Sequence, residues 1–401
     1  MEYVLIALSY IGLFLTVFWL QVVYLSSQRT IQRPSFPSVS IVIPAHNEEH
    51  TIADTLRSVL AMQYPRKKIE ILVVNDGSTD RTAEIVRTFP SVRLLSQPQA
   101  GKAAALNAGL RHCRNKLFVC LDADSTAQPD TLQRIVPHFA DSSVGAVICA
   151  IKVRQPSLFV EKLQWFEYLM SAFARKLMAK INVLFMTPGA FSVYRTGVLR
   201  TLGGFALNNL TEDFEMALRL HKHHYKILIE TDGVSYTVVP PTLRKLFKQR
   251  VRWYRGFIDN TLKYKEMLFN NTYGMLGTFQ FPVAILSMFL TVLAVSFVGV
   301  RLFKQASLFL ADLFSMGLDY FRLYEFPRLS SFLRIDALLW FPTIIGLALV
   351  LFLFYKAHKT AHERFKYGPV FVVYVLYYSV LHVISFLTAL FKELFPPQPQ
   401  W

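Results

Sequence analysis

Four long stretches, uncharged apart from a single histidine, constrain the fold of this 401-residue chain most strongly. Each has roughly the 20 consecutive apolar residues with which a helix crosses about 30 Å of hydrocarbon. They are residues 4–25, 279–300, 337–355 and 369–391, the last interrupted by His382. We therefore expect an integral membrane protein with four spans, which also accounts for a hydrophobic content of 53%.

The cations that flank these stretches predict their orientation. Arg29 and Arg33 follow the first stretch and no cation precedes it, which places residues from about 26 onward in the cytoplasm. The same stretch is too long for a signal peptide, so we expect residues 1–25 to be a retained anchor. The loop 356–367 holds four cations against one acid and should also be cytoplasmic.

One further apolar segment, residues 306–321, is short and contains Asp312 and Asp319. We expect it to be interfacial or re-entrant, because a fifth span would reverse the orientation of the segments after it. The expected organisation is an N-terminal anchor at residues 1–25, a cytosolic domain with interface helices at 26–273, and a C-terminal membrane region of about three spans at 274–401.

The cytosolic region is strongly basic, with 33 Lys and Arg against 20 Asp and Glu. Such a surface suits nucleic acid, anionic lipid or a phosphorylated ligand, and a tether to a membrane favours the last two. We therefore expect membrane lipids, and no nucleic acid, among its partners. The spacing of Cys113, Cys120 and Cys149 suits neither a disulfide framework nor a zinc site.

Strand-like and helical segments alternate through the first part of this region. Short β-rich runs without polar alternation, as expected of strands covered on both faces, are 38–44, 69–74, 92–95 and 117–121. Helical patterns fill the sequence around them at 48–60, 80–89, 102–112 and 130–139. The alternation predicts a doubly wound, Rossmann-like α/β sheet, in which ligands bind beyond the carboxyl ends of the strands.

Polar segments follow three of these strands. The first strand runs into residues 44–49 (PAHNEE), the second into 75–80 (NDGSTD) and the fourth into Asp122 and Asp124. One of these aspartates can reach a ligand while the other meets a cation, and so few hard oxygen ligands suit Mg²⁺ or Mn²⁺ shared with phosphates. Any one of these polar segments alone is better explained as an ordinary turn, but three together favour a ligand-binding site.

Glycine-rich nucleotide motifs are absent from these turns, since neither GxGxxG nor GxxxxGK[ST] occurs there. Neither a dinucleotide-binding fold nor a phosphate-loop nucleoside triphosphatase is therefore indicated. Gly101 and Lys102 open the third helix, where backbone amides and an ammonium can hold an anion. Locally they also fit a turn glycine and a solvated lysine, but their place at the same crevice favours the anion site.

Later segments carry the remaining patterns. Residues 242–256 hold six cations and no acid, which suits a departing diphosphate or lipid headgroups, and Arg250 and Arg255 stay unassigned. Thr211, Glu212 and Asp213 would by local rules alone cap the following helix. An apolar stripe over 159–177 predicts a helix that lies in the membrane interface or against the sheet. We expect His221, His223 and His224 to form a solvated basic tip at the end of a helix.

Six segments, in this order and spacing, carry a family resemblance: IVIPAHNEE, VVNDGSTD, GKAAALNAG, LDAD, LTEDFEMALRL and QRVRW. Over about residues 38–260 the chain resembles family 2, the inverting membrane-embedded β-glycosyltransferases related to cellulose, chitin, hyaluronan and poly-N-acetylglucosamine synthases. The resemblance implies a GT-A fold and a nucleotide-sugar donor, usually a UDP-sugar. The GKAAALNAG segment and the four-span layout resemble the poly-N-acetylglucosamine and chitooligosaccharide members most.

Carried over motif by motif, the resemblance implies how the donor is bound. The residues around uridine would be Pro44, Ala45, Asn47, Glu48 and Asp76. Lys102 and Asp122 would meet the ribose and phosphates, and Asp124 would ligate Mg²⁺ or Mn²⁺.

The same resemblance implies the catalytic and acceptor residues. Asp213 would be the base, with Glu212 in support. Gln249, Arg252 and Trp253 match a QxxRW motif, in which Arg252 offers a planar fork to phosphate oxygens and Trp253 a flat face to a sugar ring. The remaining matches are an acceptor-site loop with Gly189, Ala190 and Arg195, and a QxxEY string at residues 164–168.

Three functions stay open. The first is a processive synthase in the plasma membrane, with a cytoplasmic catalytic domain, that adds a sugar, with N-acetylglucosamine favoured, to a β-linked polysaccharide or oligosaccharide and exports it. The second is a single transfer to a lipid acceptor, and the third is a non-catalytic scaffold with a nucleotide pocket. Intact acids such as Asp76 and Asp213 argue against the third, and the QxxRW motif favours the first. Four spans form a thin channel wall, so a homo-oligomer or an accessory subunit stays open.

Overall fold

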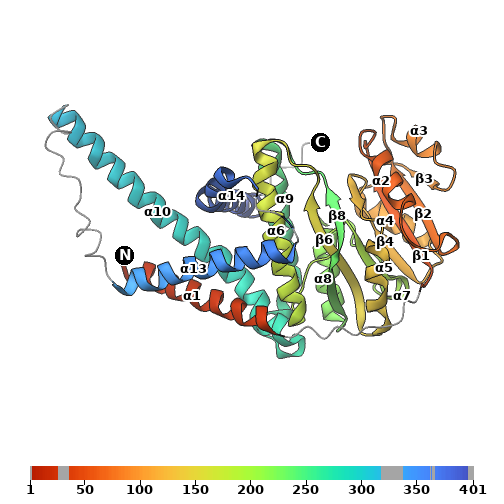
Figure 1. Ribbon diagram of the computed structural model, residues 1–401, viewed down its shortest axis with the longest axis horizontal. Helices are drawn as coiled ribbons and strands as arrows, with labels where there is room; N and C mark the ends of the chain where they lie inside the picture. Colours follow the sequence, from red (N-terminus) through yellow and green to blue (C-terminus); the bar gives the residue numbers. More distant parts are fainter. Residues whose placement is uncertain (1, 26–35, 318–336, 362, 364–365, 396–401) are drawn as a thin grey trace.

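The computed structural model describes residues 2–25, 36–317, 337–361, 363 and 366–395. The chain forms two regions, an α/β domain and a group of long apolar helices that extends from one side of it (Figure 1). Apolar helices come both before and after the α/β domain in the sequence, so this domain is inserted between them. The expected division at residues 1–25, 26–273 and 274–401 has the same order of elements, and the placement of its parts relative to a membrane stays a prediction.

A sheet that has eight strands among the described residues forms the centre of the α/β domain, in the order β3-β2-β1-β4-β7-β6-β8-β5. Its strands are β1 (Val39–Ala45), β2 (Ile69–Asp76), β3 (Arg93–Gln97), β4 (Leu117–Cys120), β5 (Ser125–Ala127), β6 (Val144–Val153), β7 (Ser192–Arg195) and β8 (Lys226–Thr237). The four expected strands are confirmed as β1 to β4, and they are parallel. Because β7 is antiparallel to both β4 and β6, the sheet is mixed, and the parallel doubly wound arrangement holds only for its first half.

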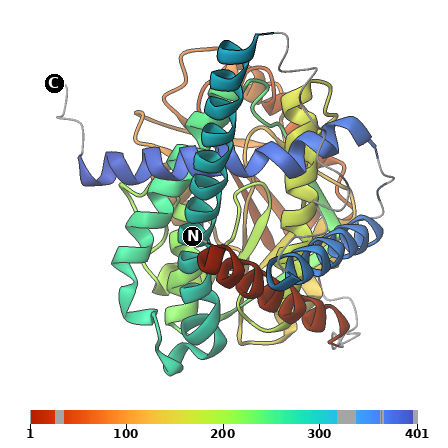
Figure 2. The same cartoon turned by 90° about the vertical axis from the view of Figure 1, so that its left-hand side faces the viewer.

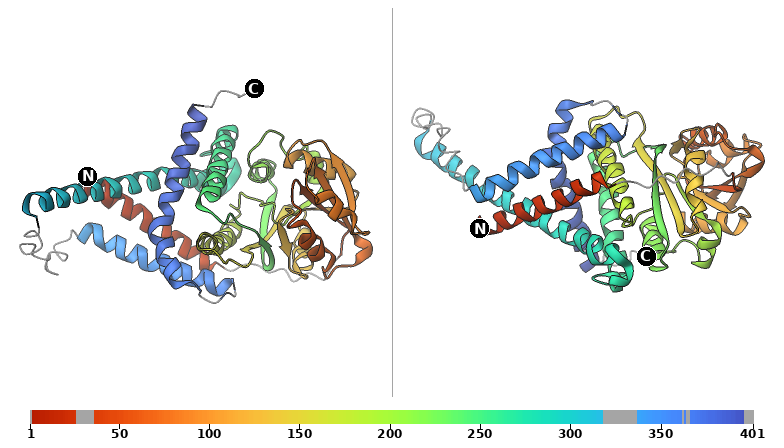
Figure 3. Two further views of the ribbon diagram at one scale, coloured as in Figure 1. Left: turned by 90° about the horizontal axis from the view of Figure 1, so that it is seen from above. Right: turned by 60° about the horizontal axis from the view of Figure 1, so that its bottom comes forward.

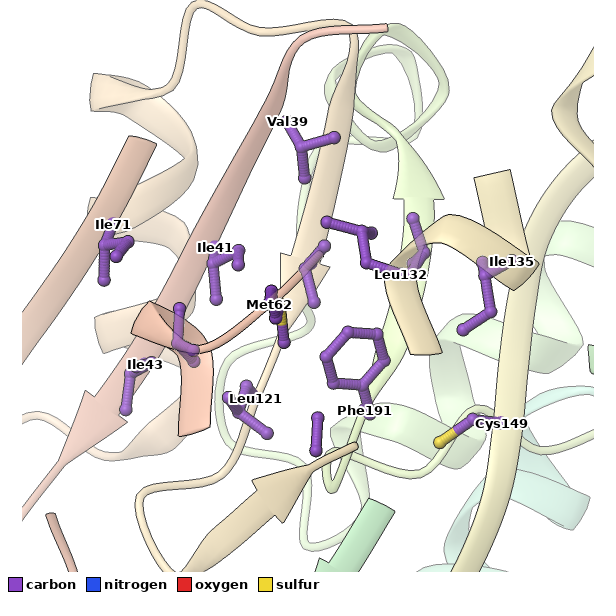
Figure 4. Packing of buried hydrophobic residues seen from close by; sticks show 14 of the residues in the cluster. Val39, Ile41, Ile43, Met62, Ile71, Leu121, Leu132, Ile135, Cys149 and Phe191 are labelled. Carbon is purple, nitrogen blue, oxygen red and sulfur yellow. The ribbon is translucent and has the colours of Figure 1, made fainter. Parts of the chain in front are cut away.

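Helices cover both faces of the sheet, and each face has its own core. These helices are α2 (Ile52–Leu60), α3 (Thr82–Arg87), α4 (Lys102–His112), α5 (Thr131–Ile135), α7 (Thr196–Thr201) and α8 (Glu212–Lys222). Because successive side chains of a strand point to opposite faces, Ile41 and Ile43 of β1 enter one core and Val42 the other. Figure 4 shows the first core, where Ile41 and Ile43 lie with Leu132 and Phe191. Burial on both faces explains why β1 and β4 show no polar alternation.

Two long helices, α6 (Phe159–Lys180) and α9 (Leu243–Lys263), lie between the sheet and the apolar helices (Figure 1). The apolar stripe of α6 is buried from two sides. Phe166 packs against the rings of Phe354 and Phe371 from the apolar helices, and Val153 of β6 belongs to the same cluster. Of the two expected placements of this stripe, burial is therefore observed, but against both the sheet and the apolar helices.

Lys180 joins the last turn of α6 to the end of the first helix, α1 (Glu2–Tyr24). Its Nζ donates to the backbone carbonyl oxygens of Val22 (3.3 Å), Val23 (2.8 Å) and Leu25 (2.8 Å). The last carbonyl groups of a helix have no partner within the helix, and a cation there also complements its dipole. The lysine therefore caps α1.

Within the described residues, three helices are long and apolar enough to cross a membrane: α1, α10 (Phe281–Met316) and α13 (Ala337–Thr360). They extend from the same side of the α/β domain (Figure 1). The last helix, α14 (Gly368–Leu394), meets the same test only as a bent pair, with 42° between Gly368–Leu376 and Tyr378–Leu394.

The direction of α14, the fourth expected span, differs from that of the other three helices. It lies across the other apolar helices rather than beside them (Figures 2 and 3). One of its faces packs on α6 and α9. The other exposes apolar side chains every three or four residues, at Val372, Val375, Leu376, Val380, Ile384, Leu387 and Phe391. Its crosswise direction fits a helix that lies along the membrane surface, while its apolar composition fits a bent span.

Two expected segments have different boundaries. The segment expected to be separate at 306–321 continues α10 as far as Met316, because its sequence holds no helix-breaking residue before Gly317; residues 318–321 lie outside the described part. Residues 306–316 are therefore not a separate segment, and their interfacial or re-entrant placement stays a prediction. The helix expected over 130–139 is divided into α5 and a 3₁₀ turn (Val136–Ala140), where Pro137 lacks the N–H that would continue an α-helix.

Candidate active site

Asp76 ends β2 and fixes the turn that leads into α4. Its Oδ1 accepts hydrogen bonds from the backbone N–H of Ala100 (2.9 Å) and from Gln97 Nε2 (2.7 Å), and its Oδ2 accepts from the backbone N–H of Gly101 (2.7 Å). Three donors satisfy a carboxylate that is buried. This turn holds Lys102, the first residue of α4, at the carboxyl edge of the sheet.

The loop after β1 is tied to the loop after β2. The backbone N–H of Asn47 donates to Ser78 Oγ (3.0 Å), and Asn47 Oδ1 accepts from the backbone N–H of Thr79 (2.9 Å). The backbone N–H of Glu48 donates to Thr82 Oγ1 (2.7 Å). These bonds and the ends of β1 and β2 place at one edge all the residues expected around uridine: Pro44, Ala45, Asn47, Glu48 and Asp76.

Lys102 links this edge to α8. Its ammonium lies 2.6 Å from Asp122 Oδ1, which follows β4, and 3.2 Å from Oε1 of Glu212, the first residue of α8. Burial opposes its charge, but Asp122 and Glu212 outweigh that effect and raise the pKa of Lys102 well above its usual range. A permanent cation therefore lies at the sheet edge, where it can receive a phosphate.

Gly189 packs directly against this ion pair. The backbone N–H of Asp122 donates to the Gly189 carbonyl oxygen (3.0 Å). A Cβ at this position would lie 2.4 Å from Lys102 Nζ and 2.6 Å from Asp122 Oδ1, so any larger residue would displace this ion pair. Ala190 is buried, and its carbonyl oxygen accepts from Ser235 Oγ (2.8 Å). The loop before β7 thus forms one wall of the site, and its contact with an acceptor stays a prediction.

Asp213, the second residue of α8, is held by two hydrogen bonds. Its Oδ1 accepts from the backbone N–H of Phe214 (2.8 Å), and its carbonyl oxygen accepts from Thr187 Oγ1 (2.7 Å). Burial, followed by the neighbouring Glu212 carboxylate, raises the pKa of Asp213 to about 6. A carboxylate with this pKa is ionised at neutral pH yet basic enough to take a proton, which is what general-base catalysis requires.

Asp124 lies close to the carboxylates of Asp122 and Glu48. Its Oδ1 accepts from Ser125 Oγ (3.1 Å), while burial, Asp122 and Glu48 raise its pKa to about 7. Such crowding favours a bound cation, and the oxygen donors suit Mg²⁺ or Mn²⁺. Among the described residues, however, no group of three His, Cys, Asp or Glu side chains is already arranged to hold a metal. The donor set therefore fits a metal whose coordination is completed by phosphates and water.

Helix α9 docks onto the start of α8. Gly256 permits this, because a Cβ there would lie 2.2 Å from Thr211 Oγ1. Asn260 Nδ2 also donates to Thr211 Oγ1 (3.0 Å). Arg252 is exposed and donates from Nη1 to the carbonyl oxygen of Leu210 (3.2 Å), so its guanidinium lies beside the segment that leads to Asp213.

The other two residues of the QxxRW motif contact Arg250, to which the sequence assigned no role. The Arg250 guanidinium lies over the ring of Trp253, 4.1 Å from its centroid, and Nη1 donates to Gln249 Oε1 (2.5 Å). Arg250 is one of the largest fully buried side chains of the described structure. Sequence reasoning missed it because six cations within 242–256 share one local pattern; the only signal was its place one residue from Gln249.

Arg195 is not part of this site, so its expected acceptor contact is wrong. In the antiparallel pairing, its Cα lies opposite Leu117 at the start of β4, at the other end of that strand from Asp122. Its guanidinium donates instead to the carbonyl oxygens of Phe139, Asp141 and Val144. The reason is the direction of β7, which carries Arg195 away from the carboxyl edge.

The expected basic tip with three histidines is also corrected. His221 is buried in α8, and its Nε2 donates to the carbonyl oxygen of Leu184 (2.7 Å). Burial lowers the pKa of His221 to about 4, so this imidazole is neutral. Only His223 and His224 are exposed at the end of the helix.

Comparison with known proteins identifies the α/β domain. Residues 40–203 match the model for glycosyl transferase family 2, and this range contains the edge residues Asp76, Lys102, Asp122, Asp124 and Gly189. These residues form a glycosyl transferase family 2 domain. Helices α8 and α9, with Asp213 and the QxxRW residues, follow the matched range.

Two curated relatives each match more than half of this chain. Poly-beta-1,6-N-acetyl-D-glucosamine synthase of Staphylococcus aureus (strain COL) is 32% identical over 273 residues, which are 65% of this chain and 63% of that protein. The protein of the same name from Staphylococcus epidermidis is 33% identical over 227 residues, 54% of either chain. The chain therefore matches less than two thirds of the length of these relatives.

A solved structure matches almost the whole chain. It is a mannosyltransferase from Pyrobaculum calidifontis in complex with GDP-Man and Mn²⁺, with a TM-score of 0.65 and 21% identity over 98% of this chain and 99% of that one. At this identity the likeness concerns the fold. It confirms a GT-A-like α/β fold that is joined to long apolar helices.

Proposed function

We propose that the protein is a membrane-bound inverting glycosyltransferase that moves N-acetylglucosamine from a UDP-sugar to the end of a growing β-linked saccharide. One observation carries this proposal: Lys102, from α4, contacts Asp122, which follows β4, and Glu212, which begins α8, in front of Gly189. A cation for a diphosphate thus adjoins Asp213, a carboxylate suited to act as a base. The names of the two staphylococcal relatives support the choice of sugar and of a polymeric product.

The chemistry needs a single displacement. Asp213 takes the proton from an acceptor hydroxyl, whose oxygen forms a bond to the anomeric carbon. The bond between that carbon and the UDP oxygen breaks on the opposite face, which inverts the configuration. Lys102 and Arg252 offset the negative charge that gathers on the departing diphosphate, and Glu212 holds the Lys102 ammonium in place.

Asp124 is the proposed metal ligand, with Asp122 beside it. Bound Mg²⁺ or Mn²⁺ would neutralise charge on the diphosphate. Residues of the chain position the nucleotide independently of the metal, since the loops that carry Asn47 and Glu48 are fixed to the loop after β2. The crowding that raises the pKa of Asp124 supports this assignment.

The acceptor end of the site is proposed to face the membrane. Trp253 lies on α9, which packs on α14. A saccharide stacked on this ring would leave the site beside the apolar helices, which suits export across the plasma membrane from a cytoplasmic catalytic domain. The basic composition of residues 26–273 supports that orientation and contact with anionic lipids.

Membranes that contain the protein should be incubated with a panel of radiolabelled UDP-sugars and the products sized, with and without excess EDTA. We expect UDP-N-acetylglucosamine to give a ladder or high-mass product that EDTA abolishes, and membranes with the Asp213→Asn variant to give none. One organic-soluble product instead means a single transfer to a lipid. Absence of transfer from every UDP-sugar refutes the proposed activity, and undiminished turnover in EDTA refutes the metal site.

A further inference from the structure

A buried ion pair joins α9 to α6. Arg250 is 1% exposed, and its Nη2 contacts Oε2 of Glu167, which is 19% exposed. Burial disfavours the charge, but Glu167 outweighs it and raises the pKa of Arg250 above its usual range. Removing two charges from water costs free energy that their attraction recovers only with further hydrogen bonds. The pair is therefore weak as a source of stability, and it has no part in the displacement described above.

Helix α14 supplies the further hydrogen bonds. Tyr378 Oη donates to Glu167 Oε2 (2.6 Å) and lies 3.5 Å from Arg250 Nη2. One turn further along both helices, Tyr254 Oη and His382 Nδ1 are 2.6 Å apart, and His382 Nε2 lies 3.8 Å from Glu167 Oε1. We call these five residues the Arg250 cluster. It connects α6, α9 and α14 by polar contacts within otherwise apolar packing.

The Arg250 cluster has one neighbour in the proposed acceptor site. The guanidinium of Arg250 lies over Trp253 at 4.1 Å from the ring centroid. Its Nε is buried and has no hydrogen-bond partner among the described residues, which is consistent with a guanidinium plane used for stacking. A cation over an indole is held electrostatically and restricts the rotation of the ring. Trp253 itself is only partly buried.

We propose that Arg250 is a positioning residue for the acceptor: fixed by Glu167 and Tyr378, it orients the Trp253 ring against which the terminal sugar of the acceptor stacks. The inference rests on the proposed function, because it needs a saccharide acceptor. It adds that a residue between the named positions of the QxxRW motif controls acceptor binding, and that the orientation of the ring depends on α14. Donor binding should be independent of it, since the residues proposed around uridine lie at the edge formed by β1 and β2, and no described contact joins Arg250 to Lys102 or Arg252.

The test compares two arginines of α9 in the full-length protein reconstituted in lipid nanodiscs. Arg255 also forms an ion pair with α14, through Glu393, but no described contact joins it to Trp253. The acceptor, a short β-1,6-linked N-acetylglucosamine oligosaccharide, is first titrated at saturating UDP-N-acetylglucosamine. The donor is then titrated at a saturating concentration of the acceptor. We expect Arg250→Gln to raise the KM for the acceptor about tenfold with no change in the KM for the donor, and Arg255→Gln to change neither.

Two milder variants keep the inference testable if Arg250→Gln fails to fold. Tyr378→Phe removes one donor to Glu167 and keeps the ring, so the acceptor KM should rise less but in the same sense. Arg250→Lys keeps the charge without the planar fork and should restore only part of the acceptor affinity. An unchanged acceptor KM, or equal rises in both KM values, in folded variants overturns the inference. Absence of transfer by the wild-type protein refutes the proposed function instead, so the two failures are distinguishable.

Discussion

The surroundings of Asp213 distinguish it from an ordinary aspartate at a helix start. Burial and the adjacent Glu212 raise its pKa, while Lys102 keeps the anion stable. We expect Asp213→Asn, which keeps the shape and removes the charge, to lower transfer by about three orders of magnitude, as for loss of a general base. UDP binding should persist, because the nucleotide residues lie on β1, β2 and their loops. Radiometric transfer and isothermal titration with UDP measure the two properties.

The matched control for this substitution is Asp141→Asn. Asp141 is exposed, and its carboxylate interacts with Ser143 and Lys226 away from the carboxyl edge. We expect nearly unchanged transfer. If folded Asp213→Asn lost UDP binding and transfer to the same degree, the role of base would be contradicted.

The same carboxyl group predicts a pH dependence. A base acts only when ionised, and the pKa of Asp213 is raised to about 6 from its ordinary value. The transfer rate should therefore reach its plateau above this pH and decrease as the pH falls through about 6. An unperturbed aspartate would cause the same decrease about two pH units lower. Measurement of kcat/KM between about pH 5 and pH 8 checks this, and a flat profile down to pH 5 would disprove it.

At the residue scale, the sequence predicted the acids best. Asp76 ends one parallel strand and Asp122 and Asp124 follow another, and because the carboxyl ends of such strands share one edge, their placement there follows from topology. The position of Arg195 could not be predicted, because the direction of β7 depends on tertiary pairing rather than on its four residues. The sequence also did not predict that Arg250 is buried while Arg252 is exposed, because both belong to the same basic run.

Among the helices, α9 and α8 approach so closely that one methyl group matters. In Gly256→Ala the new Cβ would lie 2.2 Å from Thr211 Oγ1 and 2.5 Å from its Cγ2. We expect a loss of about 1–3 kcal/mol in stability from overpacking. Transfer should also fall, because α8 carries the base. Thermal unfolding of the purified protein and radiometric transfer measure the two effects.

Gly299→Ala is the control for this helix contact. Gly299 lies on α10, and a Cβ there would have no neighbour within 4 Å. Alanine favours a helix more than glycine, so stability should stay the same or rise slightly. Similar losses in both variants would mean that the contact with Thr211 is not responsible.

At the element scale, hydrophobic patterns predicted which helices and strands form better than they predicted which elements pack together. The first four strands and α4 were expected nearly as observed, because buried parallel strands and a helix of 11 residues have distinct patterns. The burial of α6 between two layers could not be predicted, since an apolar stripe does not say what covers it. The continuation of α10 past residue 306 was missed because polar residues were interpreted as an end, although charged side chains do not break a helix.

For the whole molecule, the placement of α14 decides whether the described residues contain three candidate spans or four. Spin labels on single cysteines at Val372, Ile384 and Phe391, all on the exposed face, should report similar depths if α14 lies in the interface. A spanning helix would spread such labels over about 30 Å. Oxygen and nickel accessibility in nanodiscs measures the depth, and Cys113, Cys120 and Cys149 are buried, which limits background labelling.

Helix α10 gives the internal reference for this measurement. Its exposed residues Leu286, Val298 and Leu310 should show graded depths along the helix. Graded depths along α14 as well would confirm the fourth span that its composition predicts. The sequence alone favours a span, because the helix is apolar along its length; its bend and its contacts with α6 and α9 depend on tertiary packing that the sequence does not show.

The hydrogen bonds from Lys180 to the end of α1 couple the positions of α1 and α6. The ammonium belongs to α6, the helix that also carries Glu167, and it holds three carbonyl groups at the end of the anchor. We expect a shift of α1 along its own axis to act on α6 through these hydrogen bonds. The depth at which the bilayer holds the first helix is in this way linked to Glu167 and, through Arg250, to the Trp253 ring.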